Sequence, residues 1–167
     1  QKYDVMITNP PYMGISGLES APKSYLIKNY PDSKTDMFSM FMETGFVRKN
    51  GFIAMINMHS WMFLNSYEKL REKLSRNTFI IGMLHLGARA FEEIAGELVQ
   101  TTSFVIRNYA LPEYNGTYYR LVDSKNKEHD FLKKIDGIEF VANGKKFLKI
   151  PGGIIGYFVD QASCQHI

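Results

Sequence analysis

Apolar positions recur with strand-like and helix-like spacing in turn along the first half of the chain. Residues 3–8 form a first run of strand length, and residues 52–58 form a second run that is apolar on both faces, as in a sheet covered by helices on either side. Between them a helix is predicted from about residue 35 to 49, with Thr35 or Asp36 as its cap. The apolar positions of this helix and the glycine predicted to stop it are Met37, Phe38, Phe41, Met42, Phe46 and Gly51. The alternation indicates an α/β fold with parallel crossovers.

A second helix and a closing strand pair are predicted next. Residues 66–76 are amphipathic at helical spacing, and strands near 79–86 and 102–107 fit an antiparallel pair. The connection between these strands, residues 87–100, contains a stretch at 90–95 that favours a helical turn. We therefore expect a mixed sheet, with an antiparallel pair closing a parallel part.

The pattern changes character after residue 110. The predicted elements are, in order, a turn at 112–116, an alternating strand at 117–122, a charged helix at 124–135, a hairpin turn at Asn143 and Gly144, and a chain break at 151–153. We divide the chain accordingly into a main unit at 1–110 and a small α+β extension at 111–167.

Composition narrows the class of protein. The 167 residues are 45% hydrophobic and 14% aromatic, enough to fill the core of one globular domain. The net charge of +3 is too small to establish a nucleic-acid partner. Residues 120–149 hold eight basic and five acidic side chains, an excess for which a solvated charged face is a better explanation than a contact with the DNA backbone. The lone Cys164 excludes an internal disulfide and favours a reducing, cytoplasmic setting. No apolar run reaches membrane-spanning length.

The tetrapeptide Asn9-Pro10-Pro11-Tyr12 carries the candidate chemistry. Two prolines fix φ and keep the preceding asparagine extended, so the side-chain carbonyl of Asn9 and the main-chain carbonyl of Pro10 can project stiffly from a strand end. Two such acceptors can hold an exocyclic amino group, while the ring of Tyr12 stacks on the attached base. The alternative is a Pro-Pro loop without catalytic function. The residue types favour methylation of an amino group.

The segment from Asp4 to Gly14 resembles the catalytic motif of the S-adenosylmethionine-dependent DNA adenine methyltransferases, and the order of the later segments is most similar to the PglX-type methyltransferases of BREX phage-defence systems. The resemblance implies that residues 1–110 are the C-terminal half of a Rossmann-like catalytic domain and that residues 111–167 lead into a target-recognition region. It also implies Asn9, Pro10 and Tyr12 as catalytic residues, double-stranded DNA with a flipped adenine as substrate, and other proteins of a defence system as partners.

The chain departs from that family at one point. No Gly-rich cofactor loop stands before Asn9, and the chain opens at Gln1 without an initiator Met. We therefore expect the main S-adenosylmethionine site before Gln1, in a longer protein, and we expect these 167 residues alone to be inactive.

Other candidate residues receive narrower predictions. The resemblance makes Phe91 a second aromatic ring against the flipped base, with a core phenylalanine as the alternative. Trp61 is predicted to be a core or loop anchor rather than a platform for a base, and Arg89 to be solvated rather than bound to phosphate. Metal binding is not expected, because the histidines at 59, 85, 129 and 166 share no ligand spacing. Ser60 and Ser103 lack the context of acyl-transfer chemistry.

Three functions remain open from the sequence. The first is an adenine-specific DNA methyltransferase that acts at a defined site in phage defence or restriction-modification. The second is an amino-group methyltransferase acting on RNA or on a protein glutamine. The chain continues some sixty residues past Arg107, which favours the first. The third is a catalytically idle binding module, which the intact Asn-Pro-Pro-Tyr sequence disfavours.

Overall fold

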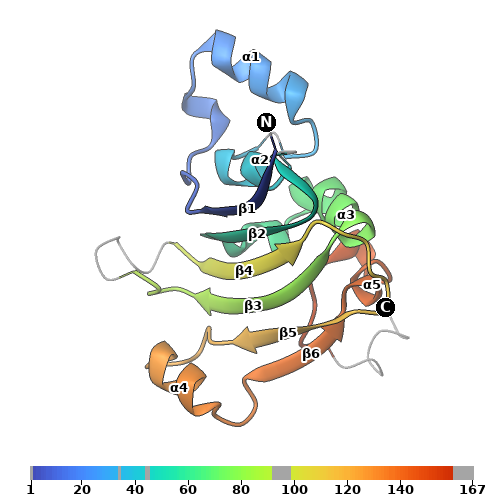
Figure 1. Cartoon of the computed structure of the whole chain (residues 1–167). Helices are drawn as coiled ribbons and strands as arrows, with labels where there is room; N and C mark the ends of the chain where they lie inside the picture. The colour runs from blue at the N-terminus through green and yellow to red at the C-terminus, as the bar shows by residue number, and fades with distance from the viewer. Residues whose placement is uncertain (1, 34, 44–45, 92–98, 160–167) are drawn as a thin grey trace.

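A computed structural model describes residues 2–33, 35–43, 46–91 and 99–159 (Figure 1). Its centre is a six-stranded sheet in the order β1-β2-β4-β3-β5-β6. The strands are β1 Tyr3–Thr8, β2 Val47–Met58, β3 Phe79–Gly87, β4 Thr101–Arg107, β5 Asn115–Arg120 and β6 Glu139–Asn143. The sheet is mixed, as predicted, because β1 pairs parallel to β2 while β4 lies antiparallel between β2 and β3.

Strand directions define two edges of the sheet. β5 runs parallel to β3 and β6 antiparallel to β5, so β1, β2, β3 and β5 all end at the same edge, which we call the carboxyl edge. The predicted extension contributes β5 and β6 to the same continuous sheet as β1 to β4. Ligands of open α/β sheets bind at this kind of edge.

The helices lie along the strand connections. They are α1 Ser20–Asn29, α2 Met37–Glu43, α3 Glu68–Asn77, α4 Lys127–Lys133 and α5 Gly144–Phe147, with short 3₁₀ turns at Ile15–Gly17, His59–Met62, Asn65–Tyr67 and Pro151–Gly153. The crossovers β1–α2–β2 and β2–α3–β3 join parallel strands, as the helical spacing predicted.

Two neighbouring rows of paired residues show which face of the sheet is buried. One row crosses all six strands through residues that are buried from β2 to β5: Thr8, Met55, Phe104, Met83, Tyr118 and Phe140. The preceding row consists of Ile7, Ala54, Val105, Gly82, Thr117 and Val141. Its Ile7 is 80% exposed and its Val141 64% exposed. The hydrophobic core of the described residues therefore lies against one face.

Several sequence-based predictions were wrong. The helix expected to reach Lys49 gives way to β2 at Val47, and Phe46 is exposed rather than part of the core. The reason is the extended pairing of this segment: Tyr3 N–H donates to the carbonyl of Phe46 at 2.8 Å, and a register shift follows before residue 52. Gly51 serves this close approach, since a Cβ there would lie 2.6 Å from the carbonyl oxygen of Asp4.

The predicted hairpin at Asn143 and Gly144 is a helix start instead. The side chain of Asn143 accepts from the main-chain N–H of Lys145 at 2.9 Å, which caps α5. Asparagine favours both turns and caps, and here the preceding strand β6, which the pattern did not reveal, decides between them. α1 was also not predicted. The proposed helical turn at 90–95 falls largely outside the described residues.

Candidate functional site

Asn9, Pro10 and Tyr12 follow directly after β1, at the carboxyl edge. The strand stops there because neither Pro10 nor Pro11 has an N–H group to continue the ladder. Pro10 is buried, whereas Asn9 is exposed at the rim. The loop thus presents the Asn9 side chain outward from a fixed backbone.

The ring of Tyr12 is held from two sides. It meets Phe38 of α2 edge-on, with ring centroids 6.4 Å apart and an interplanar angle of 88°. Its hydroxyl donates to the carbonyl oxygen of Ile56 in β2 at 3.2 Å. Burial raises the pKa of the half-buried Tyr12 above its ordinary value, so the phenol keeps its proton at neutral pH. Tyr12 is therefore a positioned, uncharged aromatic surface and not a base.

The remainder of the loop is tied to the start of α2. Gly14 and Asp36 form an isolated antiparallel bridge, and Met37 N–H donates to the carbonyl of Met13 at 3.0 Å. The Asp36 carboxylate accepts from the N–H of Phe38 at 3.4 Å, although burial raises the pKa of Asp36 overall. The helix that supplies the Phe38 contact therefore also anchors the chain just after Tyr12.

Phe91 stands in the connection that leaves β3 at the same edge, and its side chain is half-buried. Two strands, β2 and β4, separate β3 from β1 in the sheet. Arg89 in the same connection has φ +60° and is exposed. Residues 92–98 lie outside the described part of the chain. The base-stacking role of Phe91 stays a prediction.

The structure brings together two histidines that spacing had left unconnected. His59 Nδ1 lies 2.9 Å from His85 Nε2, and His85 Nδ1 lies 2.8 Å from the hydroxyl of Tyr157. Burial, followed by the charges of His59 and Arg120, lowers the pKa of His85 to about 4. Each histidine stands near the end of a strand at the carboxyl edge, which is the signal that the sequence did contain.

The other candidates are accounted for locally. Trp61 is fully buried, as predicted, and its indole N–H donates to Thr102 Oγ1 at 3.4 Å. Nowhere in the described ranges do three or more His, Cys, Asp or Glu side chains gather as metal ligands. Cys164 and His166 lie outside the described residues. No helix within the described ranges is long and apolar enough to cross a membrane.

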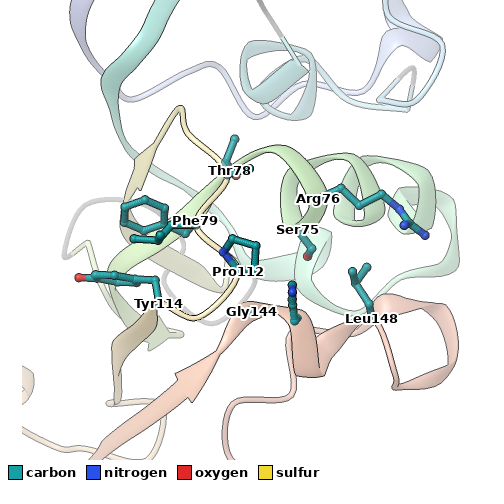
Figure 2. A pocket seen from close by; sticks show the side chains of 11 residues that line it. Ser75, Arg76, Thr78, Phe79, Pro112, Tyr114, Gly144 and Leu148 are labelled. Atoms are coloured by element: carbon teal, nitrogen blue, oxygen red, sulfur yellow. The ribbon is translucent and has the colours of Figure 1, made fainter.

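A separate hollow of about 320 Å³ lies at the opposite edge of the sheet (Figure 2). Phe79 at the start of β3 and Tyr114 just before β5 line it with ring centroids 4.3 Å apart and planes tilted by 35°, and Gly144 of α5 lines another side. We call residues 9–12 the Asn9 loop. The hollow is remote from this loop, because it lies where β3 and β5 begin, whereas the loop lies where β1 ends.

Comparison with known proteins identifies the relatives of this arrangement. The family model described as "Eco57I restriction-modification methylase" matches residues 1–91. The chain is 46% identical over 166 residues to the adenine-specific methyltransferase BrxX of Escherichia coli O9:H4 (strain HS), covering 97% of this chain. It is 44% identical over 169 residues to the adenine-specific methyltransferase PglX of Lacticaseibacillus casei (strain Zhang), covering 96% of this chain. The chain spans 14% of the length of each relative.

Solved structures share the fold. A modification subunit of a putative type I restriction enzyme from Vibrio vulnificus YJ016 matches 87% of this chain and 34% of its own with a TM-score of 0.64 at 16% identity. A putative class I S-adenosylmethionine-dependent methyltransferase from Listeria monocytogenes matches 81% of this chain and 42% of its own with a TM-score of 0.57 at 12% identity. These likenesses show that the chain shares the fold of part of each structure. S-adenosylmethionine is the cofactor that the matched methylase family implies.

Proposed function

Because the chain belongs to the Eco57I restriction-modification methylase family, we propose that it supplies the catalytic loop of an enzyme that methylates the exocyclic amino group of adenine in DNA. The observation that carries the proposal is the Asn-Pro-Pro-Tyr loop at the carboxyl end of β1. There Asn9 is exposed at the rim while Tyr12 is fixed by Phe38 and by the carbonyl of Ile56.

The loop's own groups suffice for the steps assigned to them. The side-chain carbonyl of Asn9 and the main-chain carbonyl of Pro10 each accept a hydrogen bond from one N–H group of the adenine amino group. These two hydrogen bonds favour a pyramidal, nucleophilic nitrogen. The Tyr12 ring stacks on the flipped base. S-adenosylmethionine supplies the electrophilic methyl group when bound. The nitrogen becomes positively charged on methylation, and its acidic proton then leaves without a titrating base in the loop.

The edge position of β1 supports a cofactor site outside these residues. β1 has a partner on one side only among the described strands, and its Val5 and Ile7 side chains are exposed. In an intact protein, an edge strand with exposed apolar side chains is normally covered by a neighbouring segment or paired with another strand. The Asn9 loop stands at that border, so cofactor contacts from a neighbouring part of a longer protein fit there. The domain boundary near residue 110 remains a prediction.

We further infer double-stranded DNA as the substrate, defence-system proteins as partners of the longer protein, and a cytoplasmic setting, where such DNA is found. The names of the two relatives, both adenine-specific methyltransferases, support DNA adenine over RNA or protein glutamine. They also disfavour the idle binding module.

The test uses cells that express the full-length protein that contains this chain. We expect methyladenine in their DNA by mass spectrometry, and its loss in the Asn9→Ala variant at equal protein level. Methylated RNA or methylated protein glutamine in place of methylated DNA would support the alternative substrate class. Absence of every product would support the idle module.

A further inference from the structure

Another hollow lies at the carboxyl edge of the sheet, and the proposed function does not use it. It has a volume of about 420 Å³, and we call it the histidine pocket after two of its lining residues. The lining residues used below are His59, Phe63, His85, Arg120, Asp123 and Phe158. They come from the end of β2 and the turn after it, the end of β3, the end of β5 and the turn after it, and the segment after α5. The hollow therefore opens at the same edge as the Asn9 loop.

A chain of hydrogen bonds positions the two histidines that line the histidine pocket. His85 is 5% exposed and links the Tyr157 hydroxyl, 2.8 Å away, to His59 Nδ1, 2.9 Å away. Burial raises the pKa of Tyr157 and lowers the pKa of His59, so all three groups are uncharged at neutral pH. A buried hydroxyl proton is costly to leave unpaired, so Tyr157 donates to His85 and His85 donates to His59. The chain then ends in a neutral His59 Nε2–H donor.

The remaining walls combine aromatic faces with one cation. His59 and Phe63 meet edge-on at 5.5 Å, and Phe158 lies 5.9 Å from the guanidinium carbon of Arg120. Asp123 also lines the pocket and pairs with Arg120, but both side chains are partly exposed, and such a surface pair is weak. An incoming anion can therefore compete for Arg120. Aromatic rings with a neutral donor and an available arginine suit a stacked base joined to a phosphate.

Position within the sheet connects the histidine pocket to the catalytic loop. β2, whose end carries His59, is the immediate neighbour of β1, whose end carries Asn9. Neighbouring strands lie about 4.8 Å apart, so a DNA strand at Asn9 passes the pocket within a few nucleotides. A volume of about 420 Å³ falls in the range of roughly 300–1,000 Å³ of small-molecule sites.

We propose that the histidine pocket holds one nucleotide of the substrate DNA that flanks the target adenine, with its base against the aromatic wall and its phosphate on Arg120. The proposal rests on the proposed function, since it requires DNA at the Asn9 loop. It adds a second contact point, which helps to keep the strand distorted while the adenine is flipped.

The test couples a change in the protein to a change in the DNA. The full-length protein is titrated with duplexes that contain its methylation site and an abasic position placed in turn at each flanking nucleotide. At one position, loss of the base should weaken binding about ten-fold for the parent protein, as expected for a lost stacking contact. The loss should be less than about two-fold for Phe158→Leu, which removes a 42% exposed ring from the aromatic wall. Equal losses for parent and variant at every position would overturn the proposal.

Arg120→Gln tests the phosphate separately and alters only a partly exposed side chain. The slope of log affinity against log salt should fall by about one for Arg120→Gln. It should stay unchanged for Arg48→Gln, a matched control at the opposite edge whose arginine is also exposed and pairs with Asp4. Equal slopes for Arg120→Gln and the parent would count against the pocket. A parent protein that methylates no DNA would overturn the proposed function as well, whereas intact methylation without these effects overturns the pocket alone.

Discussion

The Tyr12 side chain allows its two roles to be separated by substitution. Tyr12→Phe removes one hydrogen bond, the 3.2 Å contact to the Ile56 carbonyl, and keeps the ring that meets Phe38 edge-on. A single neutral bond of this kind contributes about 0.5–1.5 kcal/mol, so methyl transfer should fall by no more than about ten-fold. Tyr12→Ala also loses the stacking face, on the order of 1–3 kcal/mol on the flipped base, and leaves a cavity beside Phe38.

The assay is single-turnover methyl transfer by the full-length protein, combined with fluorescence of aminopurine placed at the target adenine. Tyr12→Ala should weaken base flipping, whereas Tyr12→Phe should retain much of it. Tyr25→Ala is the matched control, because it removes a 62% exposed ring from α1. If Tyr12→Phe proved as damaging as Tyr12→Ala, stacking would not be the main function of this ring.

Three further predictions concern the fold that supports the loop, each followed by hydrogen exchange in the full-length protein. Arg71→Met should lower the stability of the surrounding segments by on the order of 3 kcal/mol, because its fully buried guanidinium donates to three main-chain carbonyls, whereas exposed Arg76→Met should have little effect. Because the pKa of His85 is lowered to about 4 in the folded protein, the unfolded state takes up a proton at a higher pH than the folded state does. The free energy of unfolding should therefore fall by up to about 3 kcal/mol as the pH drops from about 6.5 to 4, and His85→Gln should flatten this dependence. Gly51→Ala places a Cβ 2.4 Å from a side-chain carbon and should loosen the β1–β2 pair, while Gly17→Ala, with open space around it, should not.

Local pattern predicted β1, β3 and β4 well because their apolar runs were bounded clearly. β1 lies where the run at residues 3–8 placed it, and the antiparallel pair of β3 and β4 was confirmed. Pattern failed where long-range pairing overrode it. Residues 47–51 have apolar and polar positions compatible with a helix, yet Val47 pairs with Tyr3, and the main chain of Asn50 and Gly51 bonds to Asn108. No local signal reports a partner sixty residues away.

The candidate site also has a part that local sequence predicts and a part that depends on long-range packing. The Asn9 loop was found from the sequence because its four chemically informative residues are contiguous. The contacts that hold it could not be predicted, since Phe38 and Ile56 are brought to Tyr12 only by the packing of α2 and β2. The pairing of His59 with His85 likewise depends on β4 lying between their strands. Sequence therefore indicated which groups are candidates for catalysis, and the fold shows which contacts position them.

The most direct test of the central claim is the rate of methyl transfer to DNA by the Asn9→Ala variant of the full-length protein in single-turnover kinetics. The lost acceptor acts chiefly in the transition state, where such a contact is worth about 3–4 kcal/mol, so we expect a rate lower by roughly a hundred- to a thousand-fold. DNA and S-adenosylmethionine affinities should stay near the parental values. Asn29→Ala, which removes an exposed asparagine from α1, should transfer methyl groups at the parental rate. Transfer by Asn9→Ala at close to the parental rate would contradict the mechanism.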